Sequence, residues 1–291
     1  MINILVTVGL AFSLIGLLAP VSKAADLPEN MLIIGYDGEA WYPYRTDNHG
    51  DWIKIEGIND SAHLSLLPQG LVIKDDANSI SLYSDSKGKK PYLSSEADGF
   101  TQVRGSDKNI AFVRLMAGKS RDTEIAVYDV EGNVIDTVNQ SSAQFHPLVN
   151  GDKIYYAHVS CRADCEIIIQ DVWVKTIGYH NARQLTKLNA TTYLHSIDPS
   201  GAYGFISSNM SGYYHLGKLD LSSEEIIWIT EGRVTDSYPS VSNDGDLFFI
   251  RRTARGSNLL VIRDVLTERS LLEQVHLPDG VTKLRYLEIL N

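Results

Sequence analysis

Short apolar segments alternate with tight polar turns along most of the chain. In the clearest copy, one strand ends near Ser242, the chain turns through Asn243-Asp244-Gly245, and an apolar strand follows over 247–250. After a loop at Arg255-Gly256, a second apolar strand is expected over 259–262. An Asn-Asp-Gly turn between apolar runs is typical of a hairpin. The pattern therefore predicts an antiparallel strand-turn-strand unit.

Degenerate copies of this unit recur upstream. Counted from the C-terminus, the turns lie 44, 50, 44 and 37 residues apart, at Gly245, Gly201, Gly151, Asp107 and Gly70. The strand after each turn is expected at 247–250, 203–206, 154–157, 110–113 and 71–73, and the next at 259–262, 215–219, 166–170, 124–130 and 79–83. Such spacing indicates a propeller or another repeat array. No long amphipathic helical stretch is visible between the strands.

The number of units follows from the length of the chain. Residues 25–291 divided by a spacing of roughly 44 give about six units, of which five have turns that align. The sixth must combine the strand-like segments 31–36, 41–45 and 52–56 with the terminal strand 284–290. Closing one blade from both chain ends removes exposed sheet edges. The sequence therefore predicts an all-β fold, a six-bladed β-propeller of four-stranded antiparallel blades that forms one domain over 25–291.

The first 24 residues have a different character. Residues 2–20 are almost wholly apolar, and Ser22-Lys23-Ala24 supplies small residues of the kind that precede a signal peptidase cut. We expect a secretory signal over 1–24, cleaved before Ala25 or Asp26. Because the start lacks Lys and Arg, a retained N-terminal anchor is the alternative. The location expected for the mature chain is periplasmic or secreted.

Composition narrows the class of partner. The chain has 26 Lys and Arg against 36 Asp and Glu, a net charge of −10. Nucleic acid binding depends on clustered basic side chains, so this balance argues against such a partner. A hydrophobic fraction of 44% supports a large core, and 15 Tyr and 22 Gly suit antiparallel sheets with turns.

The two cysteines lie close together between two expected strands of one blade. In an exported chain, Cys161 and Cys165 are expected to form a structural disulfide. Free thiols are the second possibility. Zinc would need a further Cys or His, and nothing nearby has ligand spacing. We predict neither a metal site nor a cofactor.

One segment carries a family resemblance. Residues 236–250, followed by Arg255-Gly256, resemble the TolB-type WD-like propeller repeat, whose pattern is Asp-x-x-Pro-x-Trp-Ser-Pro-Asp-Gly, an apolar strand, Arg-x-Gly and a second strand. The matching positions are Asp236, Pro239, Ser242, Asp244 and Gly245, whereas Val241 and Asn243 replace the usual Trp and Pro. Asp236 and Asp244 are expected to cap turns through backbone amides.

The resemblance covers roughly residues 60 to 265 and is specific for fold rather than function, because the repeat occurs in transport scaffolds, peptidase propellers and sugar-active enzymes. TolB itself pairs its propeller with an N-terminal α/β domain, whereas this chain passes almost directly from the signal to the first blade. What the resemblance implies is an exported propeller that presents loops and a central channel to a protein partner.

Candidate binding residues come from two places. His146 and His195 occupy similar positions in successive repeats, where their side chains are expected near the central axis; a structural role is the alternative, and metal chemistry would need a nearby carboxylate. Residues 36–52 are rich in aromatic and charged side chains, which suits a partner or carbohydrate surface or, alternatively, a blade core. The predicted binding residues are Trp41, Tyr44, Arg45, His146, His195 and Tyr238.

The sequence carries no recognisable catalytic signature. It lacks a His-Glu-x-x-His helix, a Gly-x-Ser-x-Gly elbow, a phosphate-binding glycine loop and a dinucleotide fingerprint. The leading hypothesis is an exported, non-enzymatic interaction scaffold of the bacterial periplasm or cell envelope, with an envelope or secretion-system protein as partner and no stable membrane insertion after signal cleavage. The alternative is a carbohydrate-active or peptidase-like propeller enzyme.

Overall fold

The structure is a computed structural model that describes residues 27–58, 63–76, 78–94, 99–116, 123–161, 168–267 and 271–291. These residues form strands and turns, without a helix. No helix that could cross a membrane is found in the described part of the chain. The expected signal, residues 1–24, lies outside these residues and stays a prediction.

The strands follow one another along the chain with short connections. They are β1 (Met31–Tyr36), β2 (Trp41–Thr46), β3 (Trp52–Lys54), β4 (His63–Leu67), β5 (Gly70–Lys74), β6 (Ser79–Ser84), β7 (Gly88–Ser94), β8 (Phe100–Gly105), β9 (Asn109–Leu115), β10 (Thr123–Asp129), β11 (Val134–Val138), β12 (Gln144–Asn150), β13 (Lys153–Cys161), β14 (Ile169–Thr176), β15 (Ala182–Gln184), β16 (Thr192–Ile197), β17 (Tyr203–Ser208), β18 (His215–Asp220), β19 (Ile226–Trp228), β20 (Thr235–Val241), β21 (Leu247–Thr253), β22 (Gly256–Arg263), β23 (Leu271–Gln274) and β24 (Lys283–Ile289).

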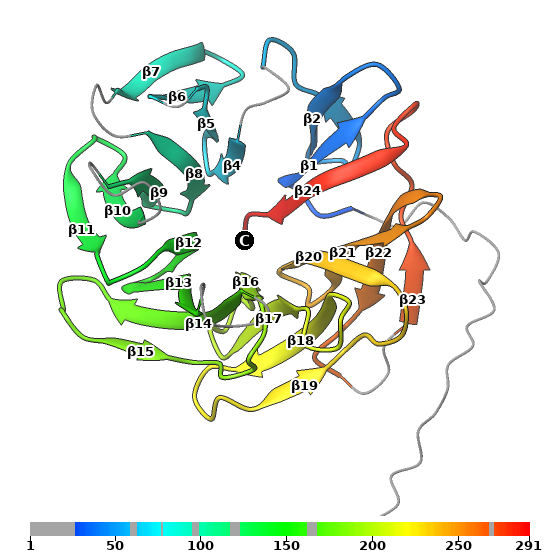
Figure 1. The fold of residues 1–291 in the computed structure, drawn as a ribbon. Helices are drawn as coiled ribbons and strands as arrows, with labels where there is room; N and C mark the ends of the chain where they lie inside the picture. Colours follow the sequence, from blue (N-terminus) through cyan, green and yellow to red (C-terminus); the bar gives the residue numbers. More distant parts are fainter. Residues whose placement is uncertain are drawn as a thin grey trace, which may run out of the picture.

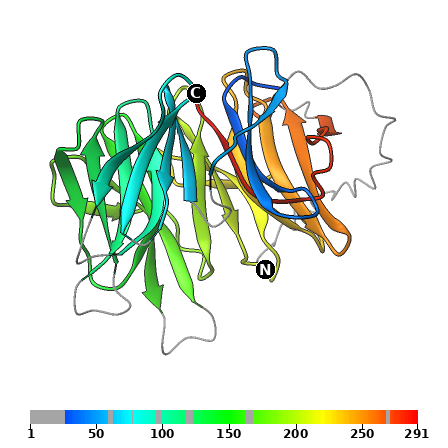
Figure 2. The ribbon, with the colours of Figure 1, turned by 90° about the horizontal axis from the view of Figure 1, so that it is seen from above.

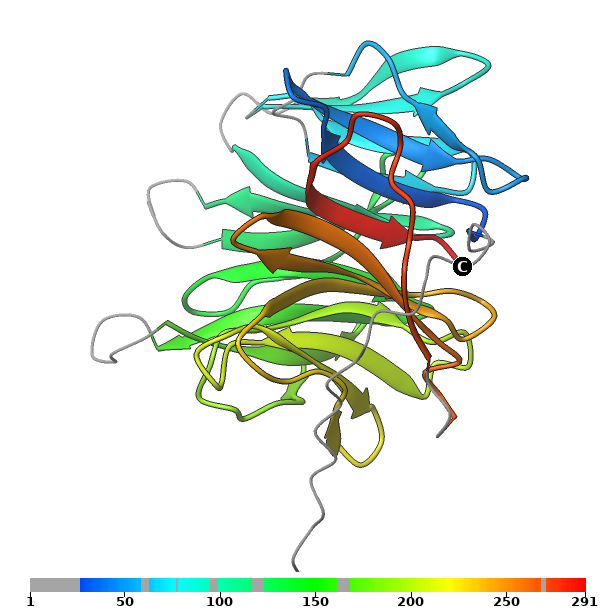
Figure 3. The same ribbon diagram turned by 90° about the vertical axis from the view of Figure 1, so that its right-hand side faces the viewer.

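The strands form six four-stranded antiparallel sheets, arranged as blades around a central axis (Figure 1). We number them in chain order: blade 1 is β24-β1-β2-β3, blade 2 is β4–β7, blade 3 is β8–β11, blade 4 is β12–β15, blade 5 is β16–β19 and blade 6 is β20–β23. The innermost strand of each blade is β24, β4, β8, β12, β16 or β20 in the same order. Views across the axis show the blades standing side by side (Figures 2 and 3). The predicted six-bladed propeller is confirmed.

Both ends of the chain close the ring within blade 1. Strand β24 pairs antiparallel with β1, so that Ile33 lies opposite Leu287 and Met31 opposite Ile289. Without β24, the row of hydrogen-bonding groups on β1 would be open to other chains. The predicted closure by N- and C-terminal strands is therefore confirmed.

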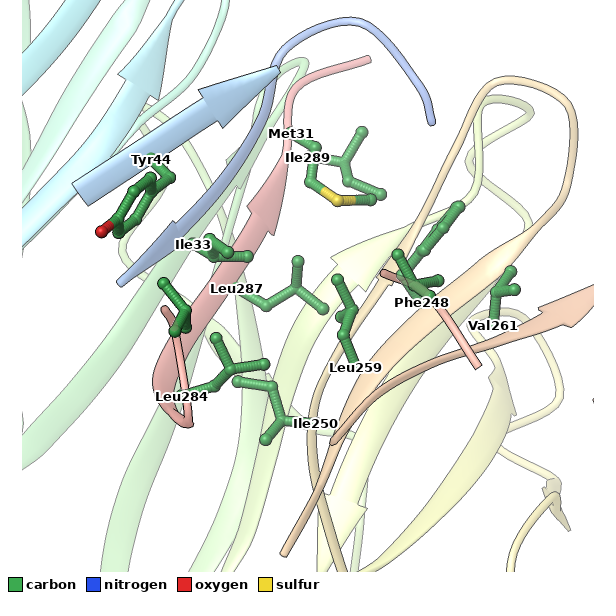
Figure 4. Close-up of a cluster of buried hydrophobic side chains, with 12 residues drawn as sticks. Met31, Ile33, Tyr44, Phe248, Ile250, Leu259, Val261, Leu284, Leu287 and Ile289 are labelled. Atoms are coloured by element: carbon green, nitrogen blue, oxygen red, sulfur yellow. The ribbon is translucent and has the colours of Figure 1, made fainter. Parts of the chain in front are cut away.

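The hydrophobic core is divided among the junctions between neighbouring blades. Each of the six junctions holds its own cluster of buried apolar side chains. Figure 4 shows the cluster between blades 6 and 1, where Ile33 and Leu287 approach Ile250 and Leu259. Each fully buried side chain of this size contributes about 1.5–3 kcal/mol relative to an exposed one. A blade is thus covered on both faces by its neighbours.

The repeat turns occur where the sequence predicts them, between the first and second strands of the blades. Gly245, Gly201 and Gly151 have φ values of +84°, +75° and +58°, which glycine adopts without steric cost. The amide of Gly245 donates to the Ser242 carbonyl at 3.0 Å. Because few residues other than glycine adopt this backbone geometry, the turn is the most recognisable part of each degenerate copy.

Two local expectations need correction. The strand predicted at 166–170 is instead β14, which begins at Ile169, because β13 continues to Cys161 and pairs there with Ile169. Asp236 is not a turn cap. It is fully buried on β20, where its carboxylate accepts two hydrogen bonds from the Arg251 guanidinium at 2.7 and 2.8 Å. The two residues face each other across neighbouring strands.

Candidate binding site at the channel mouth

Two cavities lie along the axis, at opposite ends of the inner strands. The first, which we call the cationic mouth, has a volume of about 440 Å³ and is lined from all six blades by Ile34, His63, Leu64, Gln102, Val103, Arg104, His146, Pro147, Leu148, Leu194, His195, Tyr238, Arg252, Arg285 and Tyr286. The second, the turn-side mouth, measures about 400 Å³ and is lined by several repeat turns, including Asn150-Gly151 and Asp198-Pro199. Arg104 and Leu148 line both cavities and therefore lie between them.

Irregular strands aim side chains into the cationic mouth. The pairing register of the inner strand shifts in blades 1, 3, 4, 5 and 6, which is the signature of a β-bulge. Within these irregularities, His146 has φ 49° and Tyr238 has φ 55°. A left-handed backbone is unfavourable for residues other than glycine and persists only where the surrounding structure holds it. Two such residues in one cavity mark it as a candidate functional site.

Aromatic rings form a continuous wall across four blades. The ring centroids of His146 and His195 are 6.2 Å apart, those of His195 and Tyr238 5.3 Å, and those of Tyr238 and Tyr286 5.5 Å. Tyr193 extends the wall, with its ring 4.3 Å from that of His146. Such rings supply a large, rigid contact surface with polar edges.

Arg104 connects three blades at the base of the cationic mouth. From blade 3, its guanidinium donates to the Tyr286 hydroxyl of blade 1 and to the His195 carbonyl of blade 5, each at 3.0 Å. Its Nε lies 3.1 Å from Oε1 of Glu288, a carboxylate that is only 2% exposed. Burial of the ion pair makes these groups mutually dependent, because neither charge is compensated without the other.

Glu288 extends this network to blade 2. Its carboxylate accepts hydrogen bonds from the Ser65 hydroxyl at 2.8 Å and from the Leu66 amide at 3.0 Å. The Tyr286 hydroxyl donates to the same carboxylate at 2.9 Å. The last strand of the chain is thus tied to blades 2 and 3 by polar contacts as well as by its pairing with β1.

Burial keeps the two histidines neutral. Removal from water, together with the nearby charges of Arg104 and His63, lowers the pKa of His146 to about 4. Burial, His146 and Arg104 lower the pKa of His195 well below its usual value. Each neutral ring offers one donor and one acceptor. His195 Nε2 lies 2.8 Å from the Ser207 hydroxyl, and the backbone amide of His146 donates to Gln102 Oε1 at 2.8 Å.

The arrangement suits a hydrogen-bonding ligand better than a metal ion. Among the residues that the structure describes, no three His, Cys, Asp or Glu side chains are grouped so that they could hold a metal. The described lining of the cationic mouth contains His63, His146 and His195 but no Asp or Glu, and the three histidines do not form such a group.

The structure brings three of the six predicted binding residues together. His146, His195 and Tyr238 all line the cationic mouth. Trp41 lies beside it, since the Arg285 guanidinium that lines the mouth is 5.0 Å from the Trp41 ring centroid. Tyr44, by contrast, is 5% exposed and packs between blades 1 and 6 (Figure 4), so its ring is not available to a partner here.

Arg45 forms an ion pair with Asp85 of blade 2 and does not line the mouth. The predicted disulfide stays a prediction, because the Cys161 side chain and Cys165 lie outside the described residues. The sequence interpretation missed Arg104, Tyr286 and Glu288. In the predicted terminal strand, Tyr286 and Glu288 are two residues apart, so their side chains are expected on the same face of the sheet. This spacing was the sequence signal that could have identified these two residues.

No protein-family model and no curated protein matches the chain. Solved structures do. TolB from Acinetobacter baumannii matches with a TM-score of 0.69 at 13% identity, over 91% of this chain and 67% of that one. A putative TolB from Agrobacterium tumefaciens matches at 0.61 and 12%, over 85% and 88%. An oligogalacturonate lyase in complex with manganese matches at 0.57 and 14%, over 86% and 77%.

These likenesses establish the fold. The chain is similar to TolB propellers and has a TolB-type six-bladed propeller, as the repeat in its sequence predicts. The lyase shares the same architecture. At this level of identity, architecture carries over and activity does not.

Proposed function

We propose that this protein is an exported, non-enzymatic interaction propeller of the bacterial periplasm or cell envelope, which receives a segment of a protein partner at the cationic mouth. One observation carries the proposal. A cavity lined from all six blades gathers aromatic, histidine and arginine side chains around residues held in an unfavourable backbone conformation. Tyr and Arg are enriched at the centres of protein interfaces, where a few residues supply most of the affinity.

The fold and the N-terminal sequence support this proposal. Similarity to TolB propellers favours a binding role at the channel, and the apolar segment 2–20 favours export. Cleavage before Ala25 or Asp26 is checked by mass spectrometry of the mature protein from a periplasmic fraction. If the protein were found in the cytoplasmic fraction with an intact N-terminus, the proposed location in the cell envelope would be wrong.

The His195–Ser207 hydrogen bond is the strongest argument for an enzyme. A histidine next to a hydroxyl is the beginning of a nucleophile–base pair. Ser207, however, is only 1% exposed, and no carboxylate among the described lining residues orients His195. The pair therefore resembles an internal hydrogen bond more than a reactive dyad. A carbohydrate-active or peptidase-like activity remains the alternative outcome of the test.

The test is site-specific crosslinking in the native host. A photoreactive residue replaces Tyr238 in the cationic mouth, and a matched variant carries it at Tyr179, which is 67% exposed and outside the mouth. We expect one envelope protein to crosslink at position 238 and not at position 179. Equal or absent crosslinking at both positions contradicts the proposal. Turnover of oligogalacturonate or peptides that His195→Ala abolishes would establish the enzyme instead.

A further inference from the structure

A further cavity lies in the outer half of blade 5, at strands β18 and β19 and the loops beside them. This cavity, which we call the blade 5 pocket, has a volume of about 520 Å³, and its lining includes Met210, Tyr213, His215, Trp228, Glu231 and Arg233. It shares no lining residue with either channel mouth. Its volume lies in the range of small-molecule sites. The partner segment proposed for the cationic mouth does not account for it.

Two loops form the walls of the blade 5 pocket, and both are held by hydrogen bonds. The loop between β17 and β18 is fixed near its start by Asn209, whose side-chain oxygen accepts from the Thr191 amide at 2.8 Å. Near its end, the Tyr214 carbonyl accepts from the Asp236 amide at 2.8 Å. In the loop after β19, the Thr230 hydroxyl oxygen accepts from a backbone amide of β18 at 2.9 Å. The pocket is thus formed before a ligand arrives, which lowers the entropic cost of binding.

Three large apolar side chains are exposed in the pocket. They are Met210, Tyr213 and Trp228, and none of them belongs to the clusters of buried residues that flank blade 5. A single exposed apolar side chain is ordinary on a protein surface, whereas several that line one cavity are typical of a binding site. The aromatic faces of Tyr213 and Trp228 are therefore available to a ligand.

One lining residue carries a polar atom without a partner. His215 is only 7% exposed, and its Nδ1 has no hydrogen-bond partner among the described residues. Leaving a buried polar atom unpaired is unfavourable. Because the His215 side chain lines the pocket, a ligand hydroxyl, or a water molecule held by the ligand, would supply the missing partner. A purely apolar ligand would leave this atom unpaired.

The charges of the pocket balance each other. Its described lining contains one carboxylate, Glu231, and one guanidinium, Arg233, and no lysine. Both side chains are exposed. A carboxylate only accepts hydrogen bonds and a guanidinium only donates them, whereas a hydroxyl group does both. The pair therefore suits a neutral ligand that carries several hydroxyl groups.

We infer that the blade 5 pocket binds a neutral sugar ring of a glycan, with the ring stacked on Trp228. In β-linked glucose or N-acetylglucosamine, the C–H groups form an apolar face that packs on an aromatic ring, and the hydroxyls around the edge meet His215, Glu231 and Arg233. An aromatic side chain of a polypeptide would match the apolar faces but brings at most one polar group. The inference goes beyond the proposed function and does not depend on it.

Titration of the mature protein with defined sugars tests the inference. The probes are cellotriose and chitotriose, and the control probe is sorbitol, which carries the same kind of hydroxyl groups but has no ring to stack. We expect one of the trisaccharides to bind with a Kd of about 1 mM or tighter, measured by ligand-observed NMR, and sorbitol not to bind. Trp228→Ala should weaken trisaccharide binding at least about tenfold.

Ile227→Ala is the matched control. Ile227 precedes Trp228 on β19, is also exposed and does not line the pocket, so its substitution should leave affinity unchanged. His215→Leu removes a nitrogen that has no partner in the fold, so the melting temperature should not fall, whereas affinity should drop about fivefold or more. If Trp228→Ala does not fold, Tyr213→Ala in the exposed loop carries the test.

Three outcomes would overturn the inference. They are no binding of either trisaccharide, equal binding of sorbitol, and unchanged affinity in both Trp228→Ala and His215→Leu. Tighter binding of a tripeptide that contains Tyr or Trp than of the trisaccharides would overturn it as well and would assign the pocket to a polypeptide. Each result leaves the crosslinking test at position 238 unaffected, so the proposed function stands or fails separately.

Discussion

The two mouths of the channel are built from opposite ends of the same inner strands, yet they obey different constraints. The turn-side mouth is lined by the repeat turns, in which glycine takes the left-handed positions and Asp198 accepts hydrogen bonds from the amides of Ser200 and Tyr203. The cationic mouth is lined by bulges and by two left-handed residues that are not glycine. The repeat thus fixes one end of the channel and leaves the other end free to specialise.

Their charges differ as well. The turn-side mouth contains Asp107, Asp198 and Glu288, whereas the described lining of the cationic mouth has arginine and histidine without an acid. Arg104 and Glu288 form an ion pair between the two regions. Four substitutions test how far this contrast governs stability and binding.

The largest effect is expected when the ion pair is broken. Glu288→Ala leaves Arg104 buried without a counter-charge and removes acceptors for Ser65 and Leu66, so we expect the free energy of unfolding to fall by about 3 kcal/mol or more. Glu273→Ala is the control, because Glu273 pairs with Arg263 at a more exposed site and should cost less than about 1 kcal/mol. Urea unfolding measures both. Similar losses would mean that the central pair has no special role.

Acidification should lower the free energy of unfolding through the two histidines of the cationic mouth. Because folding lowers the pKa of His146 to about 4, the unfolded chain binds protons first, and stability should fall as the pH decreases from about 6.5 towards 4. His195 adds to the same trend. The slope is at most about 1.4 kcal/mol per pH unit for each histidine. The groups that face the two rings are Arg104, His63, Tyr193 and Tyr238, with no described carboxylate among them.

Urea unfolding across this pH range measures the effect. His146→Asn should flatten the profile, whereas His180→Ala, at an exposed position, should leave it unchanged. A pH profile that His146→Asn leaves unchanged would show that this histidine does not set the pH dependence.

Substitutions at left-handed backbone positions should change the free energy of unfolding differently at the two mouths, by about 1 kcal/mol. Gly245→Ala places a Cβ at φ +84°, where no heavy atom lies closer than 3.8 Å, so its cost of about 1 kcal/mol is backbone strain alone. His146→Asn should stay within about 0.5 kcal/mol of the wild type at neutral pH, because Asn tolerates the left-handed region. A stability loss at position 146 larger than that at 245 would assign His146 a mainly structural role.

The smallest effect is expected at the turn-side mouth. Asp107→Asn removes an acidic charge from that cavity and should change the yield of crosslinking at position 238 by less than about twofold, because the charge is exposed and screened. A larger change would show that the partner contacts both mouths.

The sequence predicts the blades well because their information is local. Each turn glycine and the apolar strand after it are read from neighbouring residues, and Gly245, Gly201 and Gly151 all have the left-handed conformation that their positions imply. Repeat alignment also places His146 and His195 at equivalent positions. Closure was predictable because an unpaired edge on β1 is unfavourable.

The chemistry of the site was less predictable because it depends on residues far apart. Arg104 meets Tyr286 and Glu288 only after the ring closes, and no local pattern links them. Tyr44 was assigned to a surface for a related reason. Neighbouring blades cover both faces of a sheet, so an alternating pattern does not tell the buried face from the exposed one, as the nearly continuous burial of β1 illustrates.

The position of β24 has a consequence for biosynthesis. This strand follows the other described strands along the chain, yet it is the innermost strand of blade 1 and contributes Arg285, Tyr286 and Glu288 to the channel. A nascent chain that still lacks it has five blades and an incomplete sixth, with the Arg104 charge uncompensated. Assembly of the cationic mouth therefore requires that β24 has been synthesised, and a product that terminates before this strand has no complete binding site with which to compete for a partner.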